Sequence, residues 1–131
     1  MTDGVFPLII ETGIGVDLTG DDATKAAMRA VEDTIRRVVF PRMRDLLPGN
    51  DRANMRVEAT IAVPGADRVD LDAVRAKFPY GQVTVTAVEG GHRQPNDYLP
   101  LSLAIICHQM TSLFPAAMHG AASSFQVHVI K

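Results

Sequence analysis

The 131-residue sequence predicts a single α+β domain with a mixed sheet, elements in the order β-α-β-α-β-β, and helices on one face of that sheet. Three observations support this class. A glycine-rich break separates the first apolar run from a long stretch with helical periodicity. Two later stretches alternate apolar and polar residues, as half-buried strands do. A chain of this length can bury one core but not two, so we expect one domain over residues 1–131.

The first strand and the first helix are expected on either side of the glycines. The run PLIIETG predicts a buried strand that ends at Gly13. A helix is predicted over residues 22–38, where small and apolar residues recur at the spacing of one helical face. Asp21 or Asp22 would accept the free N–H groups at its start. Because strand, helix and strand follow one another, the first two strands should run parallel.

The middle of the chain continues the alternation of helices and strands. FPRMRDLLPGND predicts a short helix or turn, and MRVEATIAVP predicts a half-buried strand. VDLDAVRAKFP predicts a second short helix, with Asp70 as its cap. GQVTVTAVEGG predicts a third strand of alternating pattern.

The pattern weakens after Gly91. HRQPNDYLP is expected to be a loop, and SFQVHVIK a closing edge strand. LSLAIICHQM fits a buried strand or a helix equally well, because periodicity does not separate the two. With helices on one face, the other face of the sheet stays partly apolar and needs a further layer, so we predict a homo-oligomer.

Composition excludes several functional classes. The formal charge of −2 gives no general basic field, and only two Tyr and five Phe are available for stacking on bases, so we expect no nucleic-acid partner. The longest apolar stretch, LPLSLAIICHQM, is shorter than the ~20 residues that cross a membrane. The N-terminal residues carry no basic segment, so no secretory signal is expected. A single cysteine, Cys107, cannot form an internal disulfide, which favours the reducing cytoplasm.

The stretch IETGIGVDLTGDDATKAAMRAVEDTI, followed by VEATIAVP, VRAKFPYGQVTV and VEGG, resembles the signature of a conserved-hypothetical family of bacteria and archaea, the "Lin" family. The shared positions are Glu11, Gly13, Gly15, Asp17, Gly20, Asp22, Thr24, Lys25, Ala26, Ala27, Arg29 and Ala30. The resemblance covers about residues 8–91, and the chain diverges from about His92. It implies a fold similar to the chorismate-mutase-like or tubulin C-terminal-like class, whose members are often trimers with active sites between subunits. It implies no particular activity.

Two cations at the start of the first helix are candidates for ligand binding. Lys25 lies in the first turn, where the helix macrodipole disfavours a positive charge, and Arg29 lies four residues further on the same face. An anion held between the helix N-terminus and these side chains would relieve both penalties. In the alternative interpretation, Asp21 and Asp22 neutralise Lys25, while Glu32 and Asp33 neutralise Arg29.

Three carboxylates are candidates for acid–base catalysis. Glu11, Asp17 and Glu89 are predicted at or just beyond the ends of strands, where ligands collect in open α/β sheets. A carboxyl desolvated beside the others would have a raised pKa and could move a proton. The alternative is that they cap turns or pair with Lys25 and Arg29. The segment GIGVDLTG has neither spacing of a phosphate-binding loop, so nucleotide binding is not expected.

The segment EGGHR is a further candidate binding site, because two glycines present His92 and Arg93 from a turn. No metal or other cofactor is predicted. The histidines have no i, i+4 pair and no HExxH motif, and they are His92, His108, His119 and His128. Adjacent residues on a strand point to opposite faces, so Cys107 and His108 are poorly placed as a thiolate–imidazole pair.

The sequence therefore predicts a cytoplasmic homo-oligomer that binds a small anionic metabolite in a pocket between subunits. Lys25, Arg29, His92 and Arg93 would bind the anion. Whether the protein is an enzyme stays open at this point. If it is, Glu11, Asp17 and Glu89 would serve acid–base isomerisation, lyase chemistry or hydrolysis of a small carboxylated or cyclic compound. The alternative is a non-catalytic assembly or regulatory module in which the same charges join the subunits.

Overall fold

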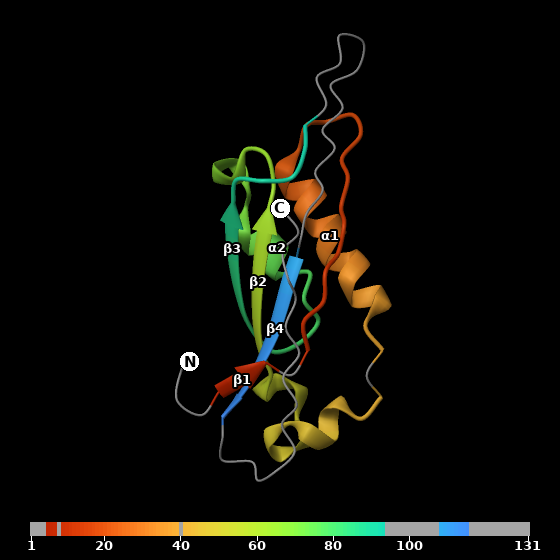
Figure 1. Ribbon diagram of the computed structural model, residues 1–131, viewed down its shortest axis with the longest axis vertical. Coiled ribbons are helices and arrows are strands. Elements are labelled where there is room, and N and C mark those ends of the chain that lie inside the picture. Colours follow the sequence, from red (N-terminus) through yellow and green to blue (C-terminus); the bar gives the residue numbers. More distant parts are fainter. Residues whose placement is uncertain (1–4, 8, 40, 94–107, 116–131) are drawn as a thin grey trace.

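The computed structural model describes residues 5–7, 9–39, 41–93 and 108–115. Its helices and strands follow the predicted order β-α-β-α-β-β (Figure 1): β1 (Val5–Pro7), α1 (Ala23–Arg37), β2 (Arg56–Ala62), α2 (Leu71–Arg75), β3 (Gln82–Val88) and β4 (His108–Pro115). Short 3-10 turns join them, namely η1 (Met43–Leu46), η2 (Pro48–Asn50), η3 (Arg52–Asn54) and η4 (Ala66–Arg68). Among the described residues, no helix has both the length and the apolar character needed to cross a membrane.

The strands form one mixed sheet in the order β1-β4-β2-β3. β2 and β3 pair in parallel, from Arg56 opposite Gln82 to Ala62 opposite Val88. β4 is antiparallel to both β2 and β1. β1 and β2 therefore run in the same direction, as predicted, but β4 lies between them.

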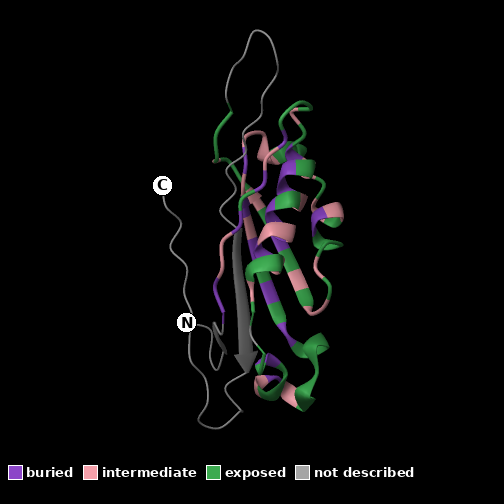
Figure 2. Cartoon of the chain, turned by 90° about the vertical axis from the view of Figure 1, so that its right-hand side faces the viewer, coloured by how far each residue is buried: buried purple, intermediate pink, exposed green. Residues whose placement is uncertain are grey.

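The helices α1 and α2 lie on one face of the sheet, which confirms the predicted layering (Figures 1 and 2). Alternate residues of β2 turn toward them, and Val57, Ala59 and Ile61 are almost fully buried. Alanines on α1 let the helix approach this surface closely, since they add little bulk between helix and sheet. The larger described core cluster is therefore a layer of aliphatic side chains between the sheet and two helices. A second cluster consists of Ile9, Met43, Leu47, Met55 and Val57.

Both helices begin at the predicted caps. The Asp22 carboxylate accepts a hydrogen bond from the backbone N–H of Lys25, and the Asp70 carboxylate accepts two, from Asp72 and Ala73. Such caps satisfy backbone donors that the helix itself leaves free. The buried face of α1 consists of Ala23, Ala26, Ala27, Ala30, Val31 and Thr34. The periodicity thus placed this helix within one residue at each end.

The face of the sheet away from the helices is mixed in character. Thr60 and Ala62 on β2 are half-buried, and Val88 at the end of β3 is 42% exposed. Thr84 and Thr86 on β3 are exposed. This agrees with the expected partly apolar surface.

The prediction of a first strand over PLIIETG was wrong. Strand β1 ends at Pro7, residues 9–16 belong to no strand of the described sheet, and Asp17 forms a single β-bridge. Ile9 and Ile10 are buried nonetheless. An apolar run indicates that residues are buried, but it does not say in which element. Here the buried residues belong to an extended segment outside the strands. Gly13 and Gly15 mark close contact with α1 rather than the end of a strand.

The C-terminal part of the chain allows only a partial comparison. Of LSLAIICHQM, the last three residues begin β4, which continues to Pro115 where no strand was predicted. Residues 101–107, including Cys107, lie outside the described residues, as does SFQVHVIK. Strand β4 lies inside the sheet, between β1 and β2, so strands on both sides satisfy its backbone groups.

Candidate functional site

Residues 9–17 form an extended segment, here called the strap, that runs beside α1. Three α1 side chains bind its backbone at regular intervals. Arg29 donates to the carbonyl of Val16, Asp33 accepts from the N–H of Ile14, and Arg37 donates to the carbonyl of Thr12. Four helical residues rise about 6 Å and two extended residues span about 6.6 Å, so a spacing of four on α1 matches a spacing of two on the strap. Side chains of the helix thus satisfy three backbone groups of the strap.

Glycines allow the strap to lie directly on the backbone of α1. A Cβ on Gly15 would lie 1.9 Å from the carbonyl oxygen of Ala26, and one on Gly13 would lie 2.2 Å from that of Ala30. Neither distance leaves room for any side chain. Gly13 and Gly15 of the N-terminal signature therefore serve close packing of the strap against the backbone of α1 at Ala26 and Ala30.

The strap ends at a buried carboxylate that helps to start α1. Asp17 is 3% exposed. Its Oδ2 accepts from the N–H of Asp22 at 2.9 Å, and its Oδ1 lies 3.3 Å from Nη1 of Arg29. In the alternative expected from sequence, Glu32 and Asp33 neutralise Arg29, but the ion pairs that they form are with other residues, and Arg29 is only the weakest of the causes that lower the pKa of Glu32. Glu32 forms an ion pair with Lys77 at 2.7 Å, and Asp33 pairs with Arg37 at 2.9 Å.

Asp21 lies just before the cap of α1, and two guanidinium groups converge on it. Its φ of 49° is in the left-handed region, which an aspartate tolerates better than most residues. Arg93, beyond the end of β3, donates to both carboxylate oxygens. Arg68 of η4, beyond the end of β2, lies 3.8 Å from the same carboxylate. The carboxyl ends of both parallel strands therefore meet the start of α1 here.

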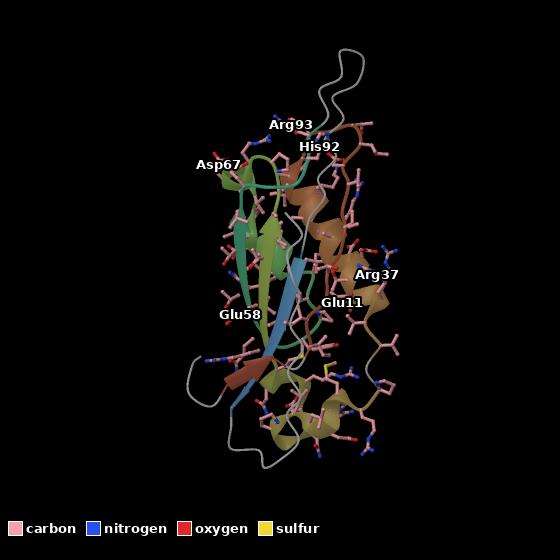
Figure 3. All side chains as sticks on the ribbon, viewed as in Figure 1. Glu11, Arg37, Glu58, Asp67, His92 and Arg93 are labelled. Atoms are coloured by element: carbon pink, nitrogen blue, oxygen red, sulfur yellow. The ribbon has the colours of Figure 1, made fainter. Side chains whose placement is uncertain are left out.

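This end of the molecule carries a group of residues that we call the α1-start cluster (Asp21, Lys25, Arg68, His92 and Arg93). His92 and Arg93 lie at the end of the sheet where α1 begins (Figure 3). The sequence reasoning missed Arg68. Arg68 follows PGAD, directly beyond a predicted strand. This position could have indicated a binding residue, because loops at the carboxyl ends of strands carry ligand-binding side chains.

Lys25 differs from every other charged residue of the N-terminal signature. It is exposed, and among the described residues its ammonium group has no ion pair or hydrogen bond. Neither aspartate before the helix neutralises it as expected, since Asp22 binds the backbone N–H of residue 25 and Asp21 pairs with arginines. A cation in the first turn of a helix opposes the macrodipole, so this position is unfavourable without an anion.

The structure does not bring the three candidate catalytic carboxylates together. Glu11 lies 3.9 Å from Arg37, beside the later half of α1 and well away from His92 and Arg93 (Figure 3). Asp17 is buried with Arg29 about two helical turns earlier. Glu89 accepts hydrogen bonds from the N–H groups of Gly65 and Ala66 at the start of η4. Each carboxylate has a structural partner.

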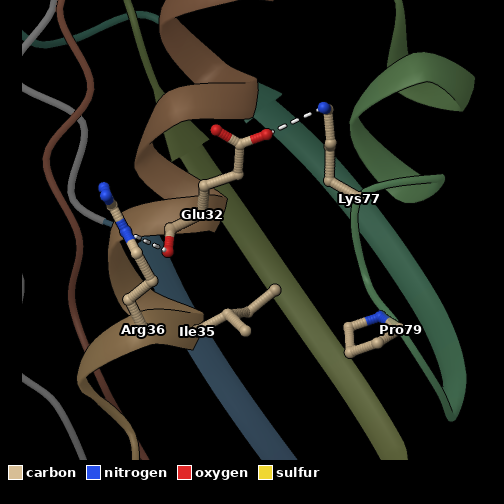
Figure 4. A pocket seen from close by; sticks show the side chains of 5 residues that line it. All are labelled: Glu32, Ile35, Arg36, Lys77 and Pro79. Carbon is tan, nitrogen blue, oxygen red and sulfur yellow. Dashed lines mark hydrogen bonds and ion pairs between the residues drawn. The ribbon is translucent and has the colours of Figure 1, made fainter.

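A separate hollow of about 290 Å³ opens between α1 and the segment before β3 (Figure 4). Ile35 and Pro79 form its apolar walls, and the Glu32–Lys77 ion pair spans its rim. The hydrogen bond from Lys77 holds the pKa of the Glu32 carboxyl below its ordinary value. Because these charges are already paired, this hollow is a weaker candidate than the α1-start cluster.

The Asp33 contact makes stability depend on pH. The backbone N–H of Ile14 and then the charge of Arg37 lower the pKa of Asp33. A lowered carboxyl pKa stabilises the fold above the unfolded pKa, and the benefit is lost as pH falls through the folded value. We expect D33N to unfold about 1 kcal/mol more easily at pH 7, with the difference disappearing as pH falls below about 4. Urea unfolding from pH 7 to 2.5 measures it. D45N, which alters only an exposed surface pair, should show no such pattern.

The described residues contain no group of three or more His, Cys, Asp or Glu side chains that could hold a metal ion. His119 and His128 lie outside the described residues, and of His108 only the backbone within β4 is described.

Fold and site together define a small α+β protein with helices on one face of a mixed four-stranded sheet, a class that fixes no single activity. The model of the Lin0512 family of conserved hypothetical proteins matches residues 7–100. The chain belongs to this family, as the sequence resemblance predicted.

A solved structure supports the architecture. The chain is similar to an FtsZ-like protein of unknown function, Npun_R1471, from Nostoc punctiforme PCC 73102. The two are 29% identical with a TM-score of 0.77, over 86% of this chain and 98% of that chain. No curated protein matches the chain. The comparisons therefore give a family and an architecture, and the reaction or ligand has to be argued from the site.

Proposed function

We propose that this protein binds a small anionic metabolite at the α1-start cluster. One observation carries the proposal: Lys25 is the charged residue of the signature stretch for which the described residues provide no partner. Arg29, the other predicted ligand-binding cation, is committed to Asp17 and to the strap. Since no residue in the described part of the chain holds the Lys25 ammonium group, this group is the one that would meet a ligand.

The chemistry of the cluster favours a carboxylate or a phosphate. Arg68 and Arg93 already bind a carboxylate, that of Asp21, and guanidinium groups suit planar or tetrahedral oxyanions. The ends of β2 and β3 and the start of α1 are also places where anions collect in α/β folds. Lys25 and Arg93 are exposed, so a second subunit would have to close the pocket predicted from sequence.

The geometry gives less support to acid–base catalysis than to binding. Glu11, Asp17 and Glu89 each have a structural partner, and Glu11 lies apart from the other two. The second candidate function is an assembly module, in which the exposed cations of the cluster contact another subunit. We also propose that the fold falls in the chorismate-mutase-like or tubulin C-terminal-like class, because the element order and the one-sided helices agree with it.

The substitution K25M tests the binding proposal, since it keeps the aliphatic stem and removes the charge. Inorganic phosphate and citrate are the probes, each at 10 mM against chloride of equal ionic strength. For a dissociation constant near 0.1 mM, wild type should gain about 2.7 kcal/mol of stability, visible as a rise in melting temperature. K25M should lose most of that rise, because the ligand then lacks its unpaired cation.

K77M is the matched control, because Lys77 is a surface lysine already paired with Glu32. It should keep the full response to phosphate or citrate. An equal response in K25M and wild type would overturn the proposal. Dissociation of an oligomer by K25M, with no anion effect in wild type, would favour the assembly module instead.

A further inference from the structure

The outer edge of β3 is unpaired within the described sheet, because β3 stands last in the order β1-β4-β2-β3. Its sequence QVTVTAV is uncharged and has no proline. Proteins usually protect exposed edges with lysine, proline or bulges, since a bare edge invites another strand. β3 has none of these within its seven residues.

Hydrogen bonds at the two ends of β3 establish which backbone groups face outward. The N–H of Gln82 donates to the carbonyl of Met55 at 2.7 Å, and the carbonyl of Val88 accepts from Val63 at 3.0 Å. In a parallel pair, alternate residues turn both backbone groups toward the neighbouring strand. Even-numbered residues of β3 therefore bind β2. Val83, Val85 and Ala87 turn their N–H and C=O groups to the open edge.

This pattern matches a two-fold axis at Val85. In an antiparallel pair of β3 strands, Val85 would face the partner's Val85 and exchange two hydrogen bonds with it. Val83 would face the partner's Ala87 in the same way, on both sides of the axis. Thr84 would face the partner's Thr86 in the close positions without hydrogen bonds, where paired threonines stabilise a sheet. Apolar residues thus meet apolar residues, and threonine meets threonine.

We infer that two copies of this chain pair through the outer edges of β3, forming one continuous sheet. The near-palindromic sequence VTVTA favours an identical strand over an unrelated one, since the same pattern is read from both directions. The axis stands perpendicular to the sheet, so the helices of both copies lie on the same face. The contact is closed and two-fold, unlike the trimer implied by the family resemblance, and it does not rest on the proposed anion site.

Two double variants that differ only at residue 86, which is lysine in one and glutamate in the other, test this pairing. T84K/T86K places lysine opposite lysine in both threonine pairs, and T84K/T86E places lysine opposite glutamate. Both threonines are exposed on the face away from the helices, so the fold should persist, with circular dichroism as the check. Sedimentation velocity at about 50 µM should give twice the 14.2 kDa chain mass for wild type and T84K/T86E. T84K/T86K should sediment as a monomer, with at least tenfold weaker self-association.

Hydrogen exchange provides the second measurement. The amides of Val83, Val85 and Ala87 should gain protection as protein concentration rises, whereas those of Thr84 and Thr86 are protected by β2 throughout. A trimeric mass, or a dimer that T84K/T86K leaves intact, would overturn the inference. A monomer with protected edge amides would do so too, because another segment of the same chain would then cover β3.

Discussion

Replacing Gly15 by alanine is expected to lower the free energy of unfolding by about 3 kcal/mol or more, with a fall in melting temperature of roughly 10 °C. The added Cβ would lie 1.9 Å from the carbonyl oxygen of Ala26 and 2.4 Å from the backbone nitrogen of Ala30. Both are backbone atoms of α1, so no rotamer change can relieve the overlap. The strap or the helix has to move, and the ladder of contacts from Arg29, Asp33 and Arg37 is then disturbed.

Gly49 offers a control for the general cost of removing a glycine. Its φ is +65°, yet the nearest atom to an added Cβ is Nδ2 of Asn54 at 3.9 Å. G49A should therefore cost only about 1 kcal/mol, from backbone conformation alone. A second test is A26G added to G15A, which should restore nothing because the overlap is with the carbonyl group. If G15A and G49A cost the same in urea unfolding, the tight strap–helix contact is wrong.

The sequence predicted α1, β2, α2 and β3 well because each is coded locally. The face of α1 repeats with helical period, Asp22 and Asp70 are caps that act within three residues, and β2 alternates along its length. Such signals lie within one element and need no knowledge of its neighbours.

The strap could not be distinguished from a strand by pattern. Both are extended, and in both an apolar run indicates burial. Within the described residues, what distinguishes the strap is that three of its backbone groups bind side chains of α1, more than ten residues later in the chain. Periodicity within one segment contains no information about such a partner.

The pairing of Asp17 with Arg29 was among the alternatives that the sequence left open, but the neighbour rules for helices did not favour it, and the two arginines that bind Asp21 were missed. Neighbour rules on helices pair residues three or four apart, and they gave other partners for Arg29 and Asp21. Asp17 is 12 residues from Arg29, while Arg68 and Arg93 are 47 and 72 residues from Asp21. Tertiary contacts outweighed local ones because a buried carboxylate such as Asp17 needs a partner more than an exposed one does.

The second large effect is expected for R29M, which removes the guanidinium group of Arg29. This variant should lower the free energy of unfolding by about 2 kcal/mol. Asp17 is buried, so its charge would then lack its ion-pair partner, and the carbonyl of Val16 would lose its donor. The cost stays below that of a fully buried pair, because the Arg29 side chain is 48% exposed and water can replace part of the contact. R36M, which removes an exposed arginine of the same helix, should cost less than 0.5 kcal/mol.

A double-mutant cycle decides whether Arg29 acts through Asp17 or through a ligand. D17N keeps an acceptor of similar shape for the N–H of Asp22 while removing the charge, so D17N/R29M should be more stable than the sum of the single losses predicts, by about 1 kcal/mol. The phosphate response should persist in R29M wherever the fold persists, since Lys25 is unaltered. Additive losses together with a missing phosphate response would place Arg29 in the ligand site. The opposite result assigns it to the strap and leaves Lys25 as the residue that meets the anion.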